Sequence, residues 1–72
     1  MSVDERRELL TWTITHEREA MRLHGHDPHP IVQDPVDPWH RYVTCRRCGS
    51  QAHATSQLDR VVLLAASDAC RR

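Results

Sequence analysis

The stretch TCRRCGS, residues 44–50, holds two of the three cysteines of this 72-residue chain. Cys45 and Cys48 are spaced as Cys-x-x-Cys, which allows them to bind one metal ion together or to form a redox-active disulfide. Residues 41–45 have the β-branched and aromatic character of a strand, and Gly49 suits a tight turn that needs a positive φ. The stretch therefore predicts a β-hairpin with both cysteines at its tip.

The short chain limits how much apolar surface can be buried. Only 39% of its residues are hydrophobic, and Phe is absent. A single core of this size supplies about 3–5 kcal/mol, so such domains usually need a disulfide, a metal or a partner. We expect one small zinc-binding domain over residues 1–72, made of a helix (1–24), a proline-rich loop (25–39) and a hairpin with a closing segment (40–72).

The composition indicates a cytoplasmic protein with no membrane association. The N-terminal stretch MSVDERRELL is charged and not apolar, so no secretory signal is visible. The longest apolar run, VVLLAA at 61–66, is too short to span a bilayer. A reducing cytosol and an odd number of cysteines both argue against structural disulfides.

The first segment has the features of an amphipathic helix. Ser2 and Glu5 form a capping box, and Gly25 is suited to end the helix. Its apolar positions roughly keep helical spacing; they are Val3, Leu9, Leu10, Ile14, Met21 and Leu23. We expect Met21 and both tryptophans, Trp12 and Trp39, to lie in the core, since an exposed tryptophan would mark a binding hot spot.

The second segment, HDPHPIVQDPVDPW, carries four prolines and fits neither a helix nor the interior of a sheet. We interpret it as a loop that wraps the domain and is anchored by Ile31, Val32, Val36 and Trp39. A partner-binding loop is the alternative.

The closing segment, SQLDRVVLLAASDACRR, has two interpretations. Ser56 and Asp59 could cap a helix that runs to Cys70, or residues 61–64 could form a buried third strand. Periodicity does not separate these for a short apolar run. We favour the strand, because a lone hairpin needs a further strand or a helix to be stable.

Cys70 is the natural third ligand for a zinc ion held by Cys45 and Cys48. Zinc takes four tetrahedral ligands, mostly thiolates and imidazoles, so the fourth must be a histidine or water. His26, freed from helical geometry by Gly25, is our first choice, with His24, His29 and His53 as rivals. His16 is expected on a helix face, and His40 on the side of its strand away from Cys45.

Three short motifs together resemble a group of small zinc-ribbon-like proteins of actinobacteria and their phages. The motifs are GH at 25–26, TCRRCG at 44–49 and SDAC at 67–70. The resemblance implies a ligand set of His26, Cys45, Cys48 and Cys70. It also fits the α+β fold that the segments predict, an N-terminal helix packed on a small hairpin or three-stranded sheet. The chain departs from the group in its proline-rich loop and in lacking a glycine before the final apolar stretch.

A zinc ion bound in this way would be structural. Four protein ligands leave no position for a catalytic water, and no catalytic constellation is visible, so we do not expect an enzyme. The alternatives are ordinary free thiols or a redox pair. The redox pair is disfavoured because such a motif belongs at a helix N-terminus within a βαβ unit.

Two functions suit a module of this kind. The first is a protein-interaction or regulatory module with a protein partner, and the resemblance allows it to be phage-encoded. The second is nucleic-acid binding, because residues 40–72 hold six arginines against two acids. These are Arg41, Arg46, Arg47, Arg60, Arg71 and Arg72. The net charge of the chain is zero, and residues 1–39 hold eight acids against four arginines. Both features favour a protein partner over nucleic acid.

Overall fold

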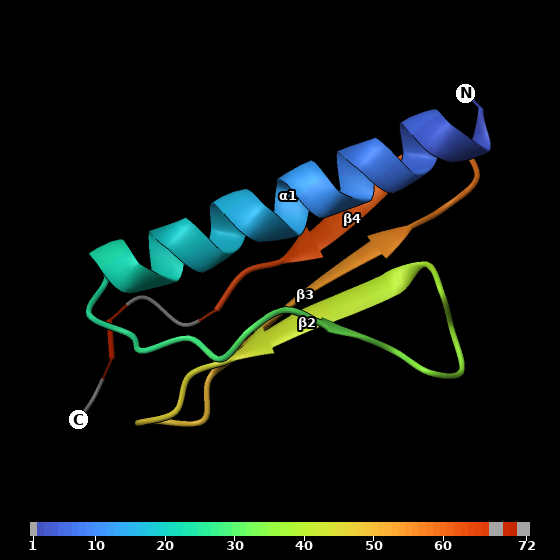
Figure 1. Ribbon diagram of the computed structural model, residues 1–72. Helices are drawn as coiled ribbons and strands as arrows, with labels where there is room; N and C mark the ends of the chain where they lie inside the picture. Colours follow the sequence, from blue (N-terminus) through green and yellow to red (C-terminus); the bar gives the residue numbers. More distant parts are fainter. Residues whose placement is uncertain (1, 67–68, 71–72) are drawn as a thin grey trace.

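A long helix lies across one face of an antiparallel sheet in the computed structural model, which describes residues 2–66 and 69–70 (Figure 1). The order along the chain is one helix followed by four strands: α1 (Val3–Leu23), β1 (Val32–Gln33), β2 (His40–Thr44), β3 (Gln51–Ser56) and β4 (Val61–Leu64). The predicted α+β fold is confirmed.

The N-terminal cap and most of the buried face of helix α1 follow the sequence pattern. The Ser2 hydroxyl accepts a hydrogen bond from the Glu5 amide at 3.2 Å and caps the first turn. Leu10, Ile14 and Met21 are fully buried against the sheet. Trp12 lies two residues from both Leu10 and Ile14, which places it on the opposite side of the helix. Its side chain is 59% exposed, so the expectation that Trp12 is core is wrong.

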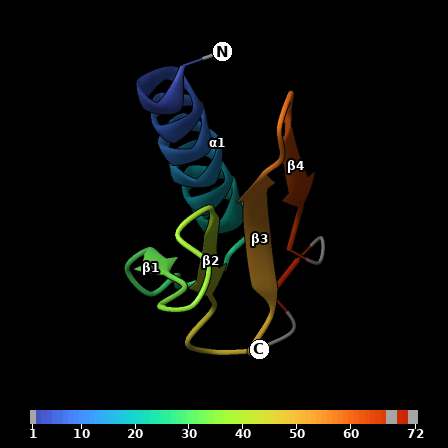
Figure 2. The same cartoon turned by 90° about the vertical axis from the view of Figure 1, so that its right-hand side faces the viewer.

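The sheet is a meander in the order β1-β2-β3-β4, with every pair antiparallel. Val43, Ala52 and Ala54 are fully buried and face the helix. The two alanines leave room for α1 to lie close to β3, and Figure 2 shows the helix on this one face. Residues 61–64 form strand β4, as we favoured over a helix. The expectation that this strand is buried is wrong, because β4 is an edge strand whose Leu63 is 39% exposed and Leu64 65% exposed.

The proline-rich segment contributes a short edge strand that the sequence did not indicate. Val32 and Gln33 pair with Tyr42 and Arg41, so the sheet has four strands and not three. Ile31 and Trp39 pack against the core, whereas Val32 is 39% exposed and Val36 is 89% exposed. Two of the four expected anchors therefore hold the loop.

Trp39 links the loop to the helix. The guanidinium carbon of Arg6 lies 4.1 Å from the centre of the indole ring, a cation–π contact. Arg6 also donates to the Ser56 hydroxyl at 3.1 Å. These contacts hold the end of the sheet near Trp39 and Ser56 against the first turns of α1.

Helix α1 is too polar to cross a bilayer. In the described part of the chain, no helix has both the length and the apolar character that a membrane span requires.

Candidate metal centre

The turn between β2 and β3 presents the Cys-x-x-Cys pair. The Cys45 amide donates to the Ser50 carbonyl at 2.8 Å, and the Gly49 amide donates back to the Cys45 carbonyl at 3.1 Å. Gly49 has a φ of 78°, a conformation that glycine adopts without the Cβ clash. The hairpin closes tightly enough to direct both thiols to one side.

The end of helix α1 positions His26. The His26 amide donates to the Met21 carbonyl at 2.9 Å, and the Gly25 amide donates to the Arg22 carbonyl at 3.0 Å. These two bonds form a Schellman motif around Gly25, whose φ is 85°. The motif ends the helix at Leu23, three residues before His26, and the side chain of His26 is only 5% exposed.

Backbone bonds hold this helix end against the hairpin. The Arg46 amide donates to the Asp27 carbonyl, and the His29 amide donates to the Thr44 carbonyl, both at 2.8 Å. Arg18, from the middle of α1, donates to the carbonyls of His29 at 2.9 Å and Pro28 at 3.2 Å. These hydrogen bonds fix the backbone around His26 beside the hairpin tip.

Cys70 reaches the same place from the C-terminal segment. Its amide donates to the His24 carbonyl at 3.1 Å, next to Gly25. Figure 1 shows the end of α1 and the β2–β3 turn at one end of the molecule. Of the SDAC motif at 67–70, Ser67 and Asp68 lie outside the described residues.

The four side chains converge on one point. The ring nitrogen of His26 and the sulfurs of Cys45, Cys48 and Cys70 all lie within 4.8 Å of one another. The Cys45 and Cys70 sulfurs are 3.8 Å apart, and the Cys48 sulfur is 3.4 Å from His26 Nδ1. Tetrahedral zinc with bonds of about 2.3 Å to sulfur and 2.0–2.1 Å to nitrogen gives separations of roughly 3.8 Å and 3.6 Å. The donor set and its spacing fit a metal ion.

The surroundings favour the thiolate form of Cys45. Burial raises the pKa of this thiol, but hydrogen bonds from the amides of Cys48, Asp27 and Arg47 and from His26 outweigh it. They lower the pKa of Cys45 from 9.0 to about 5. The hydroxyl and amide of Ser50 lower the pKa of Cys48. At neutral pH, Cys45 is already in the form that binds metal.

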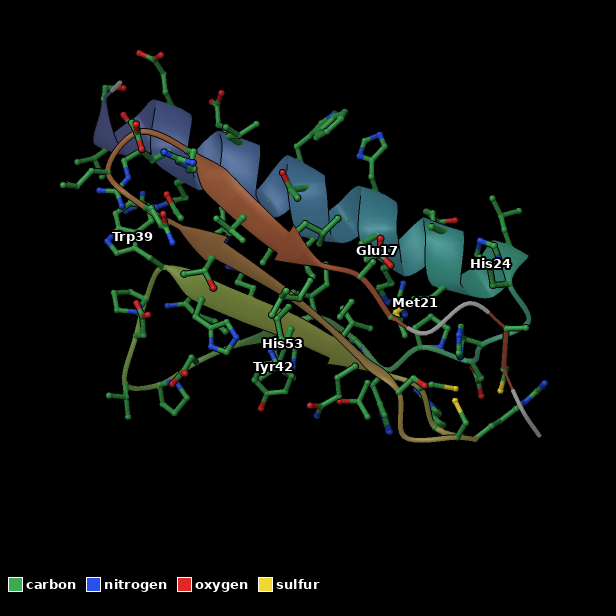
Figure 3. The ribbon with its side chains drawn as sticks, turned by 180° about the vertical axis from the view of Figure 1, so that it is seen from behind. Glu17, Met21, His24, Trp39, Tyr42 and His53 are labelled. Carbon is green, nitrogen blue, oxygen red and sulfur yellow. The ribbon has the colours of Figure 1, made fainter. Side chains whose placement is uncertain are left out.

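The rival histidines lie elsewhere. His24 and His29 are exposed, and Figure 3 shows His24 at the outer end of α1. His53 lies on the sheet face away from the helix, where its Nδ1 is 2.9 Å from His40 Nε2. His16 is exposed on α1, with its ring 4.0 Å from that of Trp12. Among the described residues, His26 is the histidine that joins the three sulfurs.

The arginines of the nucleic-acid alternative occupy different parts of the molecule. Arg46 and Arg47 lie in the turn with the cysteines, and Arg41 on β2 donates to the Thr11 hydroxyl at 2.9 Å. Arg60 pairs with Asp59 at 3.3 Å in the turn between β3 and β4, at the opposite end of β3 from Arg46. Arg71 and Arg72 lie outside the described residues.

Gly25→Ala tests the Schellman motif that positions His26. A Cβ at this site would lie 3.9 Å from Cys70 Cβ, so space is available, but the φ of 85° strains any L-residue. We expect a loss of about 1 kcal/mol in unfolding free energy and weaker metal binding. Gly25→Asn, which tolerates this conformation better, should lose less. Urea denaturation measures both variants. Equal losses of unfolding free energy would show that strain at the positive φ is not the cause.

The position of the cysteine pair favours a metal site over a redox pair. A redox pair is activated at a helix N-terminus, whereas Cys45 and Cys48 lie in a turn between antiparallel strands, beside the C-terminal end of α1. Cys45, Cys48 and Cys70 form no disulfide with one another. A comparison of the chain with protein-family models, curated proteins and solved structures found no match, so the resemblance to small zinc-ribbon-like proteins stays a prediction.

Proposed function

We propose that the chain is a small interaction module whose fold is stabilised by a structural zinc ion. Cys45, Cys48, Cys70 and His26 would bind the ion. The surface that meets a protein partner would be the outer face of helix α1. The exposed side chain of Trp12 is the observation that carries this proposal.

The zinc assignment is supported by the chemistry of the four donors. Three thiolates and an imidazole are a preferred ligand set for Zn²⁺. The Cys45–Cys70 sulfur separation of 3.8 Å and the Cys48–His26 separation of 3.4 Å are close to those of tetrahedral bonds. Because four protein ligands complete the coordination, we infer a structural ion and no enzymatic role. Such an ion would join the end of α1, the hairpin tip and the C-terminal segment, which are distant in sequence.

The outer face of α1 combines apolar and acidic groups. Leu9 and Trp12 line a shallow hollow of about 520 Å³ together with Glu5 and Glu8. These residues are spaced three or four apart, so they share one side of the helix. Leu9 is 37% exposed and Trp12 is 59% exposed. An exposed tryptophan beside two carboxylates suits a partner with an apolar anchor flanked by basic residues.

Trp12→Ala should weaken partner binding strongly without unfolding the protein. Removing a hot-spot tryptophan costs about 2 kcal/mol or more, roughly 30-fold in affinity. The exposed position predicts a stability change within about 0.5 kcal/mol. Affinity capture from the host lysate, with the retained partner then measured by calorimetry, tests both expectations.

Leu23→Ala is the matched control, because Leu23 is 87% exposed on the same helix but does not line the hollow. It should bind as wild type does. A partner that binds Trp12→Ala and wild type equally would place the interface elsewhere.

Nucleic-acid binding remains the second candidate because of one surface hollow. Arg7, Arg41 and Trp39 line it with Gln33 and Pro38, and its volume is about 360 Å³. Guanidinium groups beside an indole ring suit phosphate and a stacked base. A steep fall of oligonucleotide affinity with salt, reduced by Arg41→Gln, would favour this candidate. The dispersion of the other arginines supports the protein partner.

A further inference from the structure

Two histidines face each other on the side of the sheet away from the helix. His40 on β2 and His53 on β3 are diagonal neighbours, since the register pairs His40 with Thr55 and Tyr42 with His53. His40 Nε2 lies 2.9 Å from His53 Nδ1, and the rings are stacked with centroids 5.1 Å apart. Figure 3 shows His53 beside Tyr42 on this outer face.

The outer nitrogen of each ring faces an oxygen. His40 Nδ1 is 3.0 Å from Asp34 Oδ2, and His53 Nε2 is 3.2 Å from Gln51 Oε1. The second carboxylate oxygen of Asp34 accepts from the Val36 amide at 2.8 Å, which fixes its orientation. An ionised carboxylate and an amide oxygen are acceptors only. With the Gln51 amide in this orientation, each neutral ring donates a hydrogen bond from its outer nitrogen.

This tautomer leaves two lone pairs directed at each other across the 2.9 Å gap. Two neutral rings in this tautomer repel each other across the gap, and a metal ion or a proton bound between the two nitrogens removes that repulsion. Two imidazoles bound to one tetrahedral zinc ion have nitrogens about 3.3 Å apart, which a small rotation of either ring provides. A carboxylate that accepts from the outer N–H is also the usual orienting partner of a metal-bound histidine.

We propose that His40 and His53 form a second, solvent-accessible site for a divalent transition-metal ion of the kind that imidazole prefers, such as Zn²⁺. Asp34 and Gln51 orient the two rings, and water completes the coordination. The half-buried rings, with 22% of the His40 side chain exposed, leave the ion open to solvent. This site is independent of the cysteine cluster and of the proposed partner surface. With two protein ligands, it binds more weakly than the cluster.

Zinc titration followed by NMR of the histidine rings tests the proposal. Protein that already holds one equivalent of Zn²⁺ is titrated at pH 7.5. The second equivalent should shift the ring signals of His40 and His53 and leave those of His16 unchanged. His16 is the internal control, because it is exposed on α1 and its Nδ1 lies 2.9 Å from the Trp12 carbonyl.

His53→Gln should weaken this second binding event at least 10-fold while the first equivalent still binds. Asp34→Asn should weaken it by about 10-fold, as expected for an orienting partner of a metal ligand. Saturation of the wild type at one equivalent would overturn the proposal, as would a second event unchanged by His53→Gln. Ring signals that respond to acid but not to zinc would show that the pair holds a proton and no metal.

Discussion

Cys45→Ser is expected to abolish zinc binding and to leave the chain largely unfolded at 25 °C. Cys45 is the most buried of the three cysteines, at 2% exposed, and its sulfur accepts from the Arg47 amide at 3.4 Å. A core of this size contributes about 3–5 kcal/mol, whereas structural zinc contributes about 10–16 kcal/mol of apparent binding free energy in zinc-finger peptides. Losing the ion therefore removes the largest stabilising contribution. Circular dichroism and native mass spectrometry measure both effects.

Two further variants give this prediction its controls. Cys70→Ser should behave like Cys45→Ser, because Cys70 connects the C-terminal segment to the cluster through the 3.8 Å sulfur contact. Arg46→Ala, in the same turn but exposed, should stay folded and bind zinc. If Cys70→Ser proved as stable as wild type, Cys70 would not be a ligand.

Ile14→Ala is expected to give the largest loss among changes that leave the ligands intact. Ile14 is fully buried at the centre of the helix face that packs on the sheet. Truncating a buried isoleucine to alanine costs about 2–5 kcal/mol, because it removes apolar burial and leaves a cavity. In a domain of this size, such a loss is a large part of the stability that the core supplies.

Urea denaturation of the zinc-loaded protein measures the effect of Ile14→Ala. Leu23→Ala deletes apolar atoms from the same helix at a position 87% exposed, and should change the unfolding free energy by less than about 0.5 kcal/mol. Equal losses from the two variants would mean that the helix does not pack through the Ile14 face.

The site was predictable from the sequence because its signals are local. Cys-x-x-Cys followed by Gly49 specifies a tight turn, and the Gly25–His26 pair carries the Schellman motif that ends the helix. The bonds between residues 26–29 and the hairpin could not be predicted. They are backbone contacts between Arg46 and Asp27 and between His29 and Thr44, which depend on tertiary arrangement and not on side-chain identity.

The wrong expectation for Trp12, the missed strand β1 and the missed histidine pair have different causes. Trp12 was expected in the core because of its residue type, but helical geometry places it opposite Leu10 and Ile14. Strand β1 has only two residues, too few for any periodic signal. The pairing of His40 with His53 follows from the register once the hairpin is centred on its cysteine turn, so a residue-by-residue alignment of the two strands would have indicated it.

The central claim is that a metal ion at His26, Cys45, Cys48 and Cys70 holds this small domain together. The most direct test is the ¹H–¹⁵N correlation spectrum of the protein before and after a chelator removes the metal under reducing conditions. We predict that the dispersed spectrum collapses on metal removal and returns when one equivalent of Zn²⁺ is added. A metal-free protein that keeps its full dispersion would contradict the account.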